Sequence, residues 1–301
     1  MTIATPGILQ DADPRAWRAH RFGLPERRWA SLAGRAFWLT GGGTGYGQAL
    51  AVALAAAGAH VFLSGRRAQR LAETTAAAAK IGAPTERLVA LPCDVTRPEQ
   101  VAGAAAAIAA QAPHLFGLIN NAALPQPPTG KQALLRTSPA QWDALIATNV
   151  TGPWLVACAA LPHMIAGGAL RMLFVTSEAG WAFTPGFGPY NVSKAALNNL
   201  GASFAEECAT AFPQVDAQIN VIVPGEAATE MNQGSSASPY ALVSMALALL
   251  SHPPGGPNGR FFHRDGRHLS FAYASAYPRS LLEDAAQRGG RPAGLFRFRR
   301  R

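Results

Sequence analysis

Short apolar runs alternate with alanine-rich stretches of helical length from Arg35 onward. The strand-like runs lie at 36–39, 60–64, 87–91, 115–119, 171–175, 218–223 and 260–263, and the helix-like stretches at 45–57, 67–81, 98–111, 139–165, 189–211 and 239–251. Strands that alternate with helices form parallel sheets with helices on both faces. The sequence therefore predicts an α/β fold with a Rossmann-like, doubly wound parallel sheet, and Pro162 should kink or end the fourth helix.

The length of the chain limits the number of domains. A chain of 301 residues can bury one full core, and large α/β domains often reach this size, so we expect a single domain. We place this domain at residues 34–266. Residues 1–33 are interpreted as an N-terminal extension that caps it, with regular structure beginning at Arg35. Residues 267–301 form a C-terminal extension with a basic tail, a candidate to cover a cleft or to join subunits.

Charge, hydropathy and cysteine content exclude several classes of protein. The formal net charge is +9, but six arginines lie in the last fourteen residues, so we expect a solvated tail. The alternative is that this tail binds nucleic acid. No stretch has the ~20 uninterrupted apolar residues that cross a bilayer, so no membrane partner is expected. Cys93, Cys158 and Cys208 are odd in number and widely spaced. They predict reduced, mostly buried thiols in the cytoplasm, and neither disulfides nor a metal site.

A glycine-rich turn follows the first predicted strand and opens the first predicted helix. It consists of Thr40-Gly41-Gly42-Gly43-Thr44-Gly45-Tyr46-Gly47. In a doubly wound sheet the pyrophosphate of a dinucleotide lies at this turn, because the helix N-terminus offers unpaired N–H groups and the positive end of the helix dipole. A purely structural turn would have a similar composition, but the strand, turn and helix together favour a dinucleotide site.

Two arginines indicate which dinucleotide is bound. NAD sites place an acidic residue about 20 residues beyond the glycines to bond the ribose 2′-hydroxyl, whereas an arginine suits a 2′-phosphate. No acidic residue lies between Glu26 and Glu73, and the second strand ends in Arg66 and Arg67. Guanidinium groups bind phosphate oxygens in charge-assisted pairs, so NADP(H) is favoured over NAD(H). The alternative is that these arginines are an ordinary solvated helix start.

A tyrosine and a lysine four residues apart predict acid/base chemistry. Tyr190 and Lys194 would lie on one face of the helix 189–211, and Ser177 lies thirteen residues before Tyr190. A free tyrosine titrates near roughly 10, but a cation within about 4–6 Å favours the phenolate. We therefore expect Lys194 to lower the pKa of Tyr190, so that the pair can donate and accept protons.

These motifs together resemble those of the short-chain dehydrogenase/reductase family, in its compact single-domain branch. The resemblance runs from about Gly34 to Gly266, and it adds Cys93-Asp94-Val95, Asn120-Asn121-Ala122-Ala123, Asn149, Asn220 and Pro224-Gly225 with Thr229. It implies a catalytic NAD(P)-binding domain whose cofactor is held by Thr40, Gly41, Gly43, Thr44, Gly45, Tyr46, Gly47, Arg66, Arg67, Asp94, Val95, Asn121, Ala122, Ala123, Tyr190, Lys194, Pro224, Gly225 and Thr229.

The same resemblance implies roles for four catalytic residues. Tyr190 would exchange a proton with the substrate oxygen, and Ser177 would hold that oxygen. Lys194 would bond the nicotinamide ribose and tune Tyr190. Asn149 would anchor a water that links Lys194 to solvent.

Ala123 departs from the family's pattern, and Glu178 places a charge beside a predicted catalytic residue. Ala123 stands where the family usually has glycine, which adds a methyl group near the cofactor, and we expect it to be tolerated. Glu178 follows Ser177 directly, and its carboxylate either faces solvent or shapes the substrate pocket.

The predicted function is an NADP(H)-preferring oxidoreductase that interconverts a ketone or other carbonyl and a secondary alcohol by hydride transfer, without a metal. Its partners would be a small-molecule substrate and further copies of the chain, in a homodimer or homotetramer. A sugar-modifying member of the epimerase or dehydratase type is one alternative, but that branch would place glycine at Thr44. A non-catalytic dinucleotide-binding sensor is another, and the complete set of Ser177, Tyr190 and Lys194 counts against it.

Overall fold

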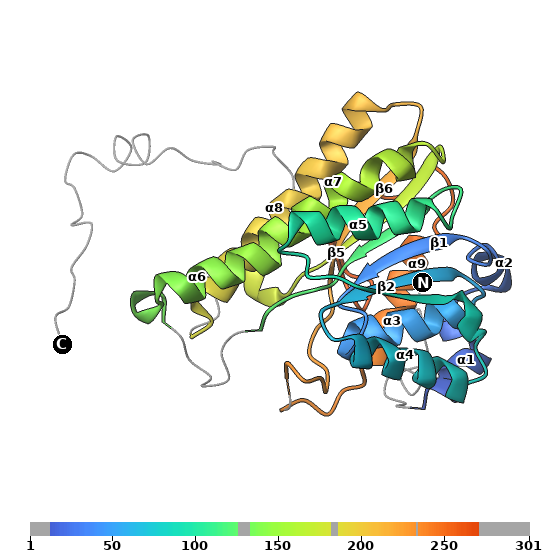
Figure 1. Cartoon of the computed structure of the whole chain (residues 1–301), viewed down its shortest axis with the longest axis horizontal. Coiled ribbons are helices and arrows are strands. Elements are labelled where there is room, and N and C mark those ends of the chain that lie inside the picture. The colour runs from blue at the N-terminus through green and yellow to red at the C-terminus, as the bar shows by residue number, and fades with distance from the viewer. Residues whose placement is uncertain (1–12, 126–132, 182–185, 233, 271–301) are drawn as a thin grey trace, which may run out of the picture. The chain divides into compact units, whose positions relative to one another are not determined.

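The computed structural model describes residues 13–125, 133–181, 186–232 and 234–270. There, the strands form one sheet in the order β3-β2-β1-β4-β5-β6-β7-β8 (Figure 1). They are β1 (Ala36–Thr40), β2 (His60–Gly65), β3 (Leu88–Pro92), β4 (Gly117–Asn120), β5 (Ala169–Val175), β6 (Asp216–Val223), β7 (Arg260–His263) and β8 (His268–Ser270). Strands β1 to β7 pair in parallel, and the order reverses between β1 and β4. The predicted doubly wound sheet of Rossmann type is confirmed.

Helices cover both faces of this sheet. The main ones are α3 (Gly45–Ala56), α4 (Ala68–Lys80), α5 (Pro98–Ala109), α6 (Pro139–Ile146), α7 (Gly152–Ile165), α8 (Gly188–Ala211) and α9 (Val243–Leu250). Helices α3, α4 and α9 share one apolar core with Phe37 and Leu39 of β1, and α5, α7 and α8 share the other with Trp38. Successive residues of a strand point to opposite faces, and a sheet covered on both faces buries every position. This explains why the strands are continuous apolar runs.

The expected single helix over 139–165 is divided in the structure. A π-helical segment, η5 (Ala147–Thr151), separates α6 from α7 and carries Asn149. Pro162 lies inside α7, which continues to Ile165, so the prediction that Pro162 could end the helix is wrong. The irregularity occurs instead at η5. Widened turns of this kind are often found at functional sites.

The segment before β1 is helical and belongs to the core. It contains α1 (Pro14–Ala19), η2 (Arg21–Gly23) and α2 (Glu26–Ala30). Phe22 is fully buried, and its ring lies 6.0, 5.9 and 6.0 Å from the ring centroids of Trp17, Trp29 and Tyr240. The backbone of Phe22 has φ of +51°, which is unfavourable for a bulky residue and is held by this aromatic packing. The expectation that regular structure begins at Arg35 is therefore wrong.

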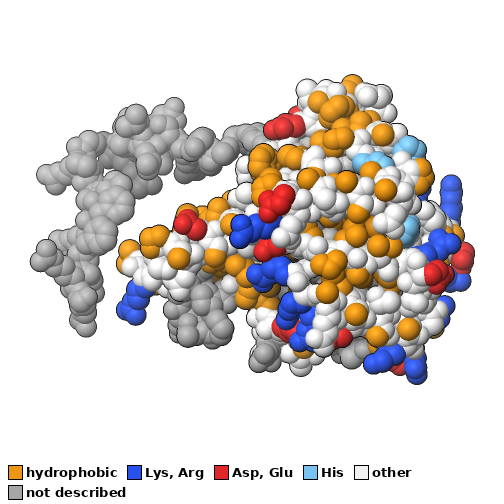
Figure 2. All heavy atoms as spheres, viewed as in Figure 1, with side chains coloured by type: hydrophobic (Ala, Val, Ile, Leu, Met, Phe, Trp, Pro, Cys, Tyr) orange, Lys and Arg blue, Asp and Glu red, His pale blue; other side chains and the backbone are white. Residues whose placement is uncertain are grey.

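The chain ends, the charged surface and the cysteines were also the subject of predictions. Residues 271–301, with the basic tail, lie outside the described residues, as do residues 1–12. Figure 2 shows basic and acidic side chains interspersed on the face that it draws. Cys93 and Cys208 are buried as expected, but Cys158 is exposed on α7. Among the described helices, the run Pro139–Ile165 alone is long and apolar enough to cross a membrane, and its buried side chains Val156 and Met164 pack in the core beneath the sheet.

Candidate active site

The glycine-rich turn joins β1 to α3 next to the point where the strand order reverses. Gly41 and Gly45 have φ of +67° and +55°, a region that favours glycine. A Cβ on Gly47 would lie 2.0 Å from the carbonyl oxygen of Gly41, so no side chain fits there. The turn therefore brings bare backbone and the N-terminus of α3 to one place, and these residues fit the pyrophosphate of a dinucleotide.

Asn121 and Thr40 tie the end of β4 to this turn. Asn121 Nδ2 donates to the carbonyl oxygens of Thr40 and Gly41, each at 3.1 Å. Thr40 Oγ1 accepts the backbone N–H groups of Asn121 and Ala122, each at 3.1 Å. Ala123 follows them, partly exposed. The predicted cofactor residues of β1 and β4 therefore lie side by side.

The residues predicted to bind adenosine lie beyond the ends of β2 and β3. Burial raises the pKa of the Asp94 carboxyl, but hydrogen bonds from Thr96 and the positive charge of nearby Arg66 outweigh burial, so the pKa lies below its ordinary value. Arg67 has a different partner, because its Nη2 donates to Glu230 Oε2 at 2.8 Å. Arg66 therefore lies near Asp94, whereas Arg67 is bound to Glu230.

Asn149 is fully buried on η5. Its Oδ1 accepts the backbone N–H of Leu124 at 2.7 Å, and its Nδ2 donates to the Leu124 carbonyl and to Ser193 Oγ, each at 3.1 Å. Asn149 therefore links the segment after β4 to the helix residue that precedes Lys194. Val95 packs close by, and a Cβ on Gly152 would lie 2.7 Å from its Cγ2.

Ser177, Tyr190 and Lys194 come together at the carboxyl end of β5. Ser177 follows the strand, and its side chain is hydrogen-bonded to the Tyr190 phenol. Lys194 follows Tyr190 by one turn of α8, and its Nζ lies 5.7 Å from the centroid of the Tyr190 ring. Both side chains are buried. One strand end and one helix face thus assemble the three predicted catalytic residues.

The electrostatics of this group differ from the expectation. Burial raises the pKa of Tyr190 to about 12, and the hydrogen bond with Ser177 opposes this rise only in part. Burial lowers the pKa of Lys194 to about 8, and its Nζ donates to the carbonyl oxygen of Val175 at 3.1 Å. The expectation that Lys194 lowers the pKa of Tyr190 is therefore wrong here. Desolvation of both groups dominates, and the ammonium is directed to a carbonyl.

The segment after β6 carries the remaining predicted cofactor residues. Gly225 has φ of +66°, and its carbonyl oxygen accepts the Tyr46 phenol at 2.8 Å. Burial raises the pKa of Tyr46 above its ordinary value. Arg264 Nη1 donates to the Pro224 carbonyl oxygen at 3.3 Å, and a Cβ on Gly225 would lie 2.9 Å from Arg264 Cζ. Tyr46 thus fastens α3 to Pro224 and Gly225.

Two residues that sequence reasoning missed lie at the end of β7, and one of them contacts Glu178, the residue after Ser177. Glu178 is 53% exposed, and its Oε1 lies 3.3 Å from His263 Nε2. His263 Nδ1 lies in turn 2.9 Å from Asp265 Oδ2. The end of β7 was a usable signal, because functional side chains of parallel sheets gather at the carboxyl ends of strands. No group of side chains placed to hold a metal ion occurs in the described part of the chain.

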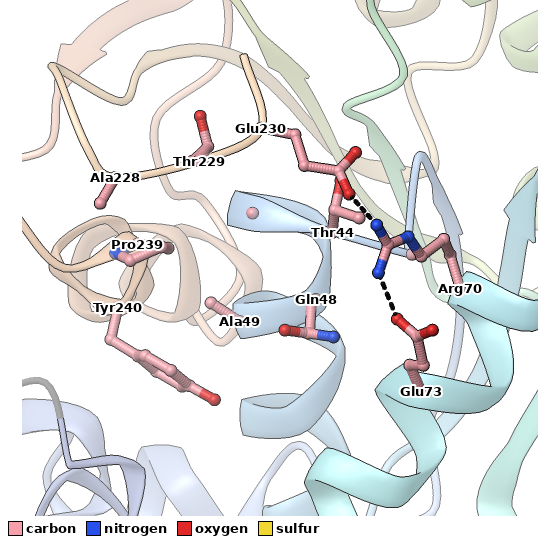
Figure 3. A pocket seen from close by; sticks show the side chains of 12 residues that line it. Thr44, Gln48, Ala49, Arg70, Glu73, Ala228, Thr229, Glu230, Pro239 and Tyr240 are labelled. Atoms are coloured by element: carbon pink, nitrogen blue, oxygen red, sulfur yellow. Dashed lines mark hydrogen bonds and ion pairs between the residues drawn. The ribbon is translucent and has the colours of Figure 1, made fainter. Parts of the chain in front are cut away.

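A cavity of about 510 Å³ lies beside the glycine-rich turn (Figure 3). It is open to solvent and lies between α3, α4, the loop after β6 and η7 (Pro239–Leu242). Its lining residues are Gly43, Thr44, Gly45, Gln48, Ala49, Arg70, Glu73, Ala228, Thr229, Glu230, Pro239 and Tyr240. Figure 3 shows the Arg70 guanidinium between Glu230 and Glu73. Gly43, Thr44 and Gly45 of the turn line the cavity, and Tyr190 and Lys194 do not, so it lies where we expect the phosphates of a dinucleotide. Sequence reasoning missed Arg70 and Glu230, which no local pattern marks.

Comparison with known proteins agrees with this geometry. The family model described as short chain dehydrogenase matches residues 35–239. The chain belongs to the short-chain dehydrogenase family. This short-chain dehydrogenase is 34% identical over 205 residues to gluconate 5-dehydrogenase of Gluconobacter oxydans (strain 621H), covering 67% of the chain and 75% of the relative. It is therefore an oxidoreductase that acts on CH–OH or C=O groups.

Two further similarities concern a fungal relative and a solved structure. The short-chain dehydrogenase is 33% identical over 172 residues to short chain dehydrogenase pigC of Monascus ruber, over 56% of the chain and 55% of that relative. A crystal structure of a metagenomic short-chain oxidoreductase in complex with NADP is 28% identical, with a TM-score of 0.65, and the match covers 75% of the chain and 95% of that structure.

Proposed function

We propose that this short-chain dehydrogenase is an NADP(H)-preferring enzyme that interconverts a ketone or other carbonyl and a secondary alcohol on a small molecule. The observation that carries the proposal is the buried Tyr190 phenol, hydrogen-bonded to Ser177 with Lys194 one helical turn away. This group lies at the carboxyl edge of the sheet, as does the glycine-rich turn that fits a dinucleotide. Acid/base and hydride chemistry can therefore meet at one edge.

Each residue has a distinct task in this proposal. The nicotinamide, when bound, supplies or accepts the hydride. Tyr190, whose pKa burial raises to about 12, keeps its proton at neutral pH and gives it to the substrate oxygen in the reducing direction. Ser177 donates a hydrogen bond to the same oxygen. Asn149 positions α8 through Ser193, one residue before Lys194, and its water-anchoring role stays a prediction.

Arg66 is the residue on which the cofactor preference rests. It lies exposed beyond β2, near Asp94, where the adenosine end of a dinucleotide is expected. A similar metagenomic short-chain oxidoreductase, solved in complex with NADP, is consistent with this preference.

Two measurements test the proposal. The first is turnover of a panel of ketones and alcohols with both cofactors, monitored by nicotinamide absorbance; no turnover of any ketone or alcohol would contradict the activity. The second is the affinity for NADPH and NADH by fluorescence titration, in the unmodified protein and in Arg66→Asp. We expect NADPH to bind more tightly, and Arg66→Asp to erase or reverse the difference. Equal affinities in the unmodified protein would remove the preference.

The assembly and location of the enzyme are part of the same proposal. We infer a homodimer or homotetramer, whose interface would bury exposed apolar side chains such as Trp142, Trp154 and Val192 on α6, α7 and α8. A cytoplasmic location stays a prediction from the cysteine pattern.

A further inference from the structure

One carboxylate and two arginines bridge the two sides of the cavity beside the glycine-rich turn. Glu230 Oε2 lies 2.8 Å from Arg67 Nη2, and Glu230 Oε1 lies 2.6 Å from Arg70 Nη2. Each carboxylate oxygen therefore has its own guanidinium, and Figure 3 shows the arm to Arg70. We call these three residues the Glu230 clasp. It joins α4 and its N-cap residue to the loop after β6.

Both sides of the clasp rest on the glycine-rich turn. A Cβ on Gly43 would lie 2.8 Å from Arg70 Cβ, so the stem of this arginine packs on the turn. A Cβ on Gly45 would lie 3.0 Å from Thr229 Cγ2, so the residue before Glu230 packs there too. The Arg70 stem and the backbone beside Glu230 are therefore already held in place by the turn. The ion pair between them forms with less loss of side-chain entropy than a pair between two freely moving surface residues.

A tight turn presents Glu230 to the arginines. Thr229 and Asn232 exchange backbone hydrogen bonds of 3.3 and 3.1 Å, and Thr229 Oγ1 also accepts the Asn232 N–H at 3.1 Å. Glu230 is thus at the corner of this turn, with its pKa held below the ordinary value by the hydrogen bond from Arg67. It carries a negative charge at any pH at which the enzyme would be assayed.

The clasp uses the groups that a 2′-phosphate would need. A carboxylate held by guanidinium groups makes the same charge-assisted contacts as a phosphate monoester. Arg66 makes no ion pair with any residue that the structure describes, whereas Arg67 and Arg70 are both engaged by Glu230. A phosphate that recruits Arg67 must therefore displace Glu230. NAD(H) has a hydroxyl at that position and need not disturb the clasp.

We propose that Glu230 sets the cofactor discrimination of this enzyme by competing with the 2′-phosphate of NADP(H) for Arg67 and Arg70. This inference rests on the proposed NADP(H) site at Arg66. Binding of the phosphate releases the turn of residues 229–232 from α4, and NAD(H) leaves the clasp closed. Glu230 thus weakens the binding of NADP(H) selectively.

The variant Glu230→Gln tests this competition. It keeps the size of the side chain and removes its charge. Fluorescence titration gives the affinities for NADPH and NADH, and competition gives those for 2′,5′-ADP and 5′-ADP, which lack the nicotinamide. We expect NADPH and 2′,5′-ADP to bind roughly threefold to tenfold more tightly, the range that exposed ion pairs support, and NADH and 5′-ADP to be unchanged. Thermal melting of each variant checks the fold.

Glu226→Gln is the matched control. Glu226 is exposed on the same loop, and its side chain makes no ion pair with a described residue. The Glu226→Gln variant removes one negative charge from the same loop and leaves the Glu230 clasp intact. It should therefore leave the ratio of NADPH to NADH affinity unchanged.

Three results would overturn the inference. The first is unchanged or weaker NADPH binding in Glu230→Gln, and the second is an equal gain for all four ligands, which would indicate a general charge effect. The third is an equal gain in Glu226→Gln.

The variant Arg66→Asp distinguishes a failure of this inference from a failure of the proposed function. If Arg66→Asp weakens NADPH binding while Glu230→Gln has no effect, only the inference is wrong. If Arg66→Asp leaves NADPH binding unchanged, the cofactor choice fails and the inference fails with it.

Discussion

Lys194→Met should make the protein more stable at neutral pH while abolishing its activity. Burial lowers the pKa of Lys194 from 10.5 to about 8, so the folded state binds this proton more weakly than the unfolded state does. Between about pH 8 and 10.5 the unfolded chain holds more protons, and the stability of the unmodified protein therefore rises with pH. Below about pH 8 the unmodified protein carries the whole cost of burying the charge.

The size of the effect follows from the same residue. One pKa unit corresponds to about 1.4 kcal/mol, so the lowering of the Lys194 pKa costs about 3 kcal/mol at neutral pH. The substitution also removes the hydrogen bond from Nζ to the Val175 carbonyl, which is worth about 1 kcal/mol. We therefore expect Lys194→Met to be more stable by about 2 kcal/mol at about pH 7, and roughly equal in stability at about pH 9.5.

Urea denaturation at the two pH values measures this difference. Lys80→Met is the control, because Lys80 is exposed at the end of α4 and its removal should give no difference that changes with pH. A gap between Lys194→Met and the unmodified protein that stays constant with pH would refute the reasoning, as would a variant that is less stable at neutral pH. A catalytic lysine that weakens the fold is an instance of the trade between stability and activity.

Two further substitutions test the active site. Tyr190→Phe should lower turnover by about 10²–10⁴-fold, the usual contribution of a general acid, and leave the dissociation constant for NADPH nearly unchanged; a variant that keeps most of its activity would remove Tyr190 from the mechanism. Gly47→Ala should abolish binding of both cofactors and lower the melting temperature, because its Cβ would lie 2.0 Å from the Gly41 carbonyl oxygen. Gly103→Ala, where a Cβ meets nothing within 4 Å, is the control, and equal behaviour of the two variants would contradict the close-packing argument.

The parts of the fold that the sequence predicted are those with a local cause. Strands β1 to β7 and the main helices were located to within a few residues, because runs buried on both faces and alanine-rich helices are visible in short windows. Strand β8, beyond the expected end of the domain at Gly266, was not predicted. The meeting of Tyr190 and Lys194 follows from helical spacing alone. The association of Thr40 with Asn121 follows from strand ends that share one edge of the sheet.

The parts that were missed depend on contacts between distant residues. The helices before β1 exist because Trp17 and Phe22 find aromatic and apolar partners near η7, which no short window shows. Arg67 was predicted to bind the cofactor, but its partner in the structure, Glu230, lies 163 residues away in the sequence. The direction of the Tyr190 pKa also needed the structure, since spacing places a cation nearby but does not report how much water has been removed.

The packing of Phe22 has a consequence for protein engineering. Ser244 Oγ donates to the Phe22 carbonyl at 2.7 Å, so the segment before β1 is fastened by backbone as well as by aromatic rings. The family match begins at residue 35. A shortened protein that starts there, with a fusion partner or affinity tag in place of the earlier residues, would lose Trp17 and Phe22 from the core. The loss of Phe22 would expose the ring of Tyr240, which also lines the cavity beside the glycine-rich turn. A loss of cofactor binding in such a fusion would therefore report a damaged scaffold, although every residue of the dinucleotide site is still present.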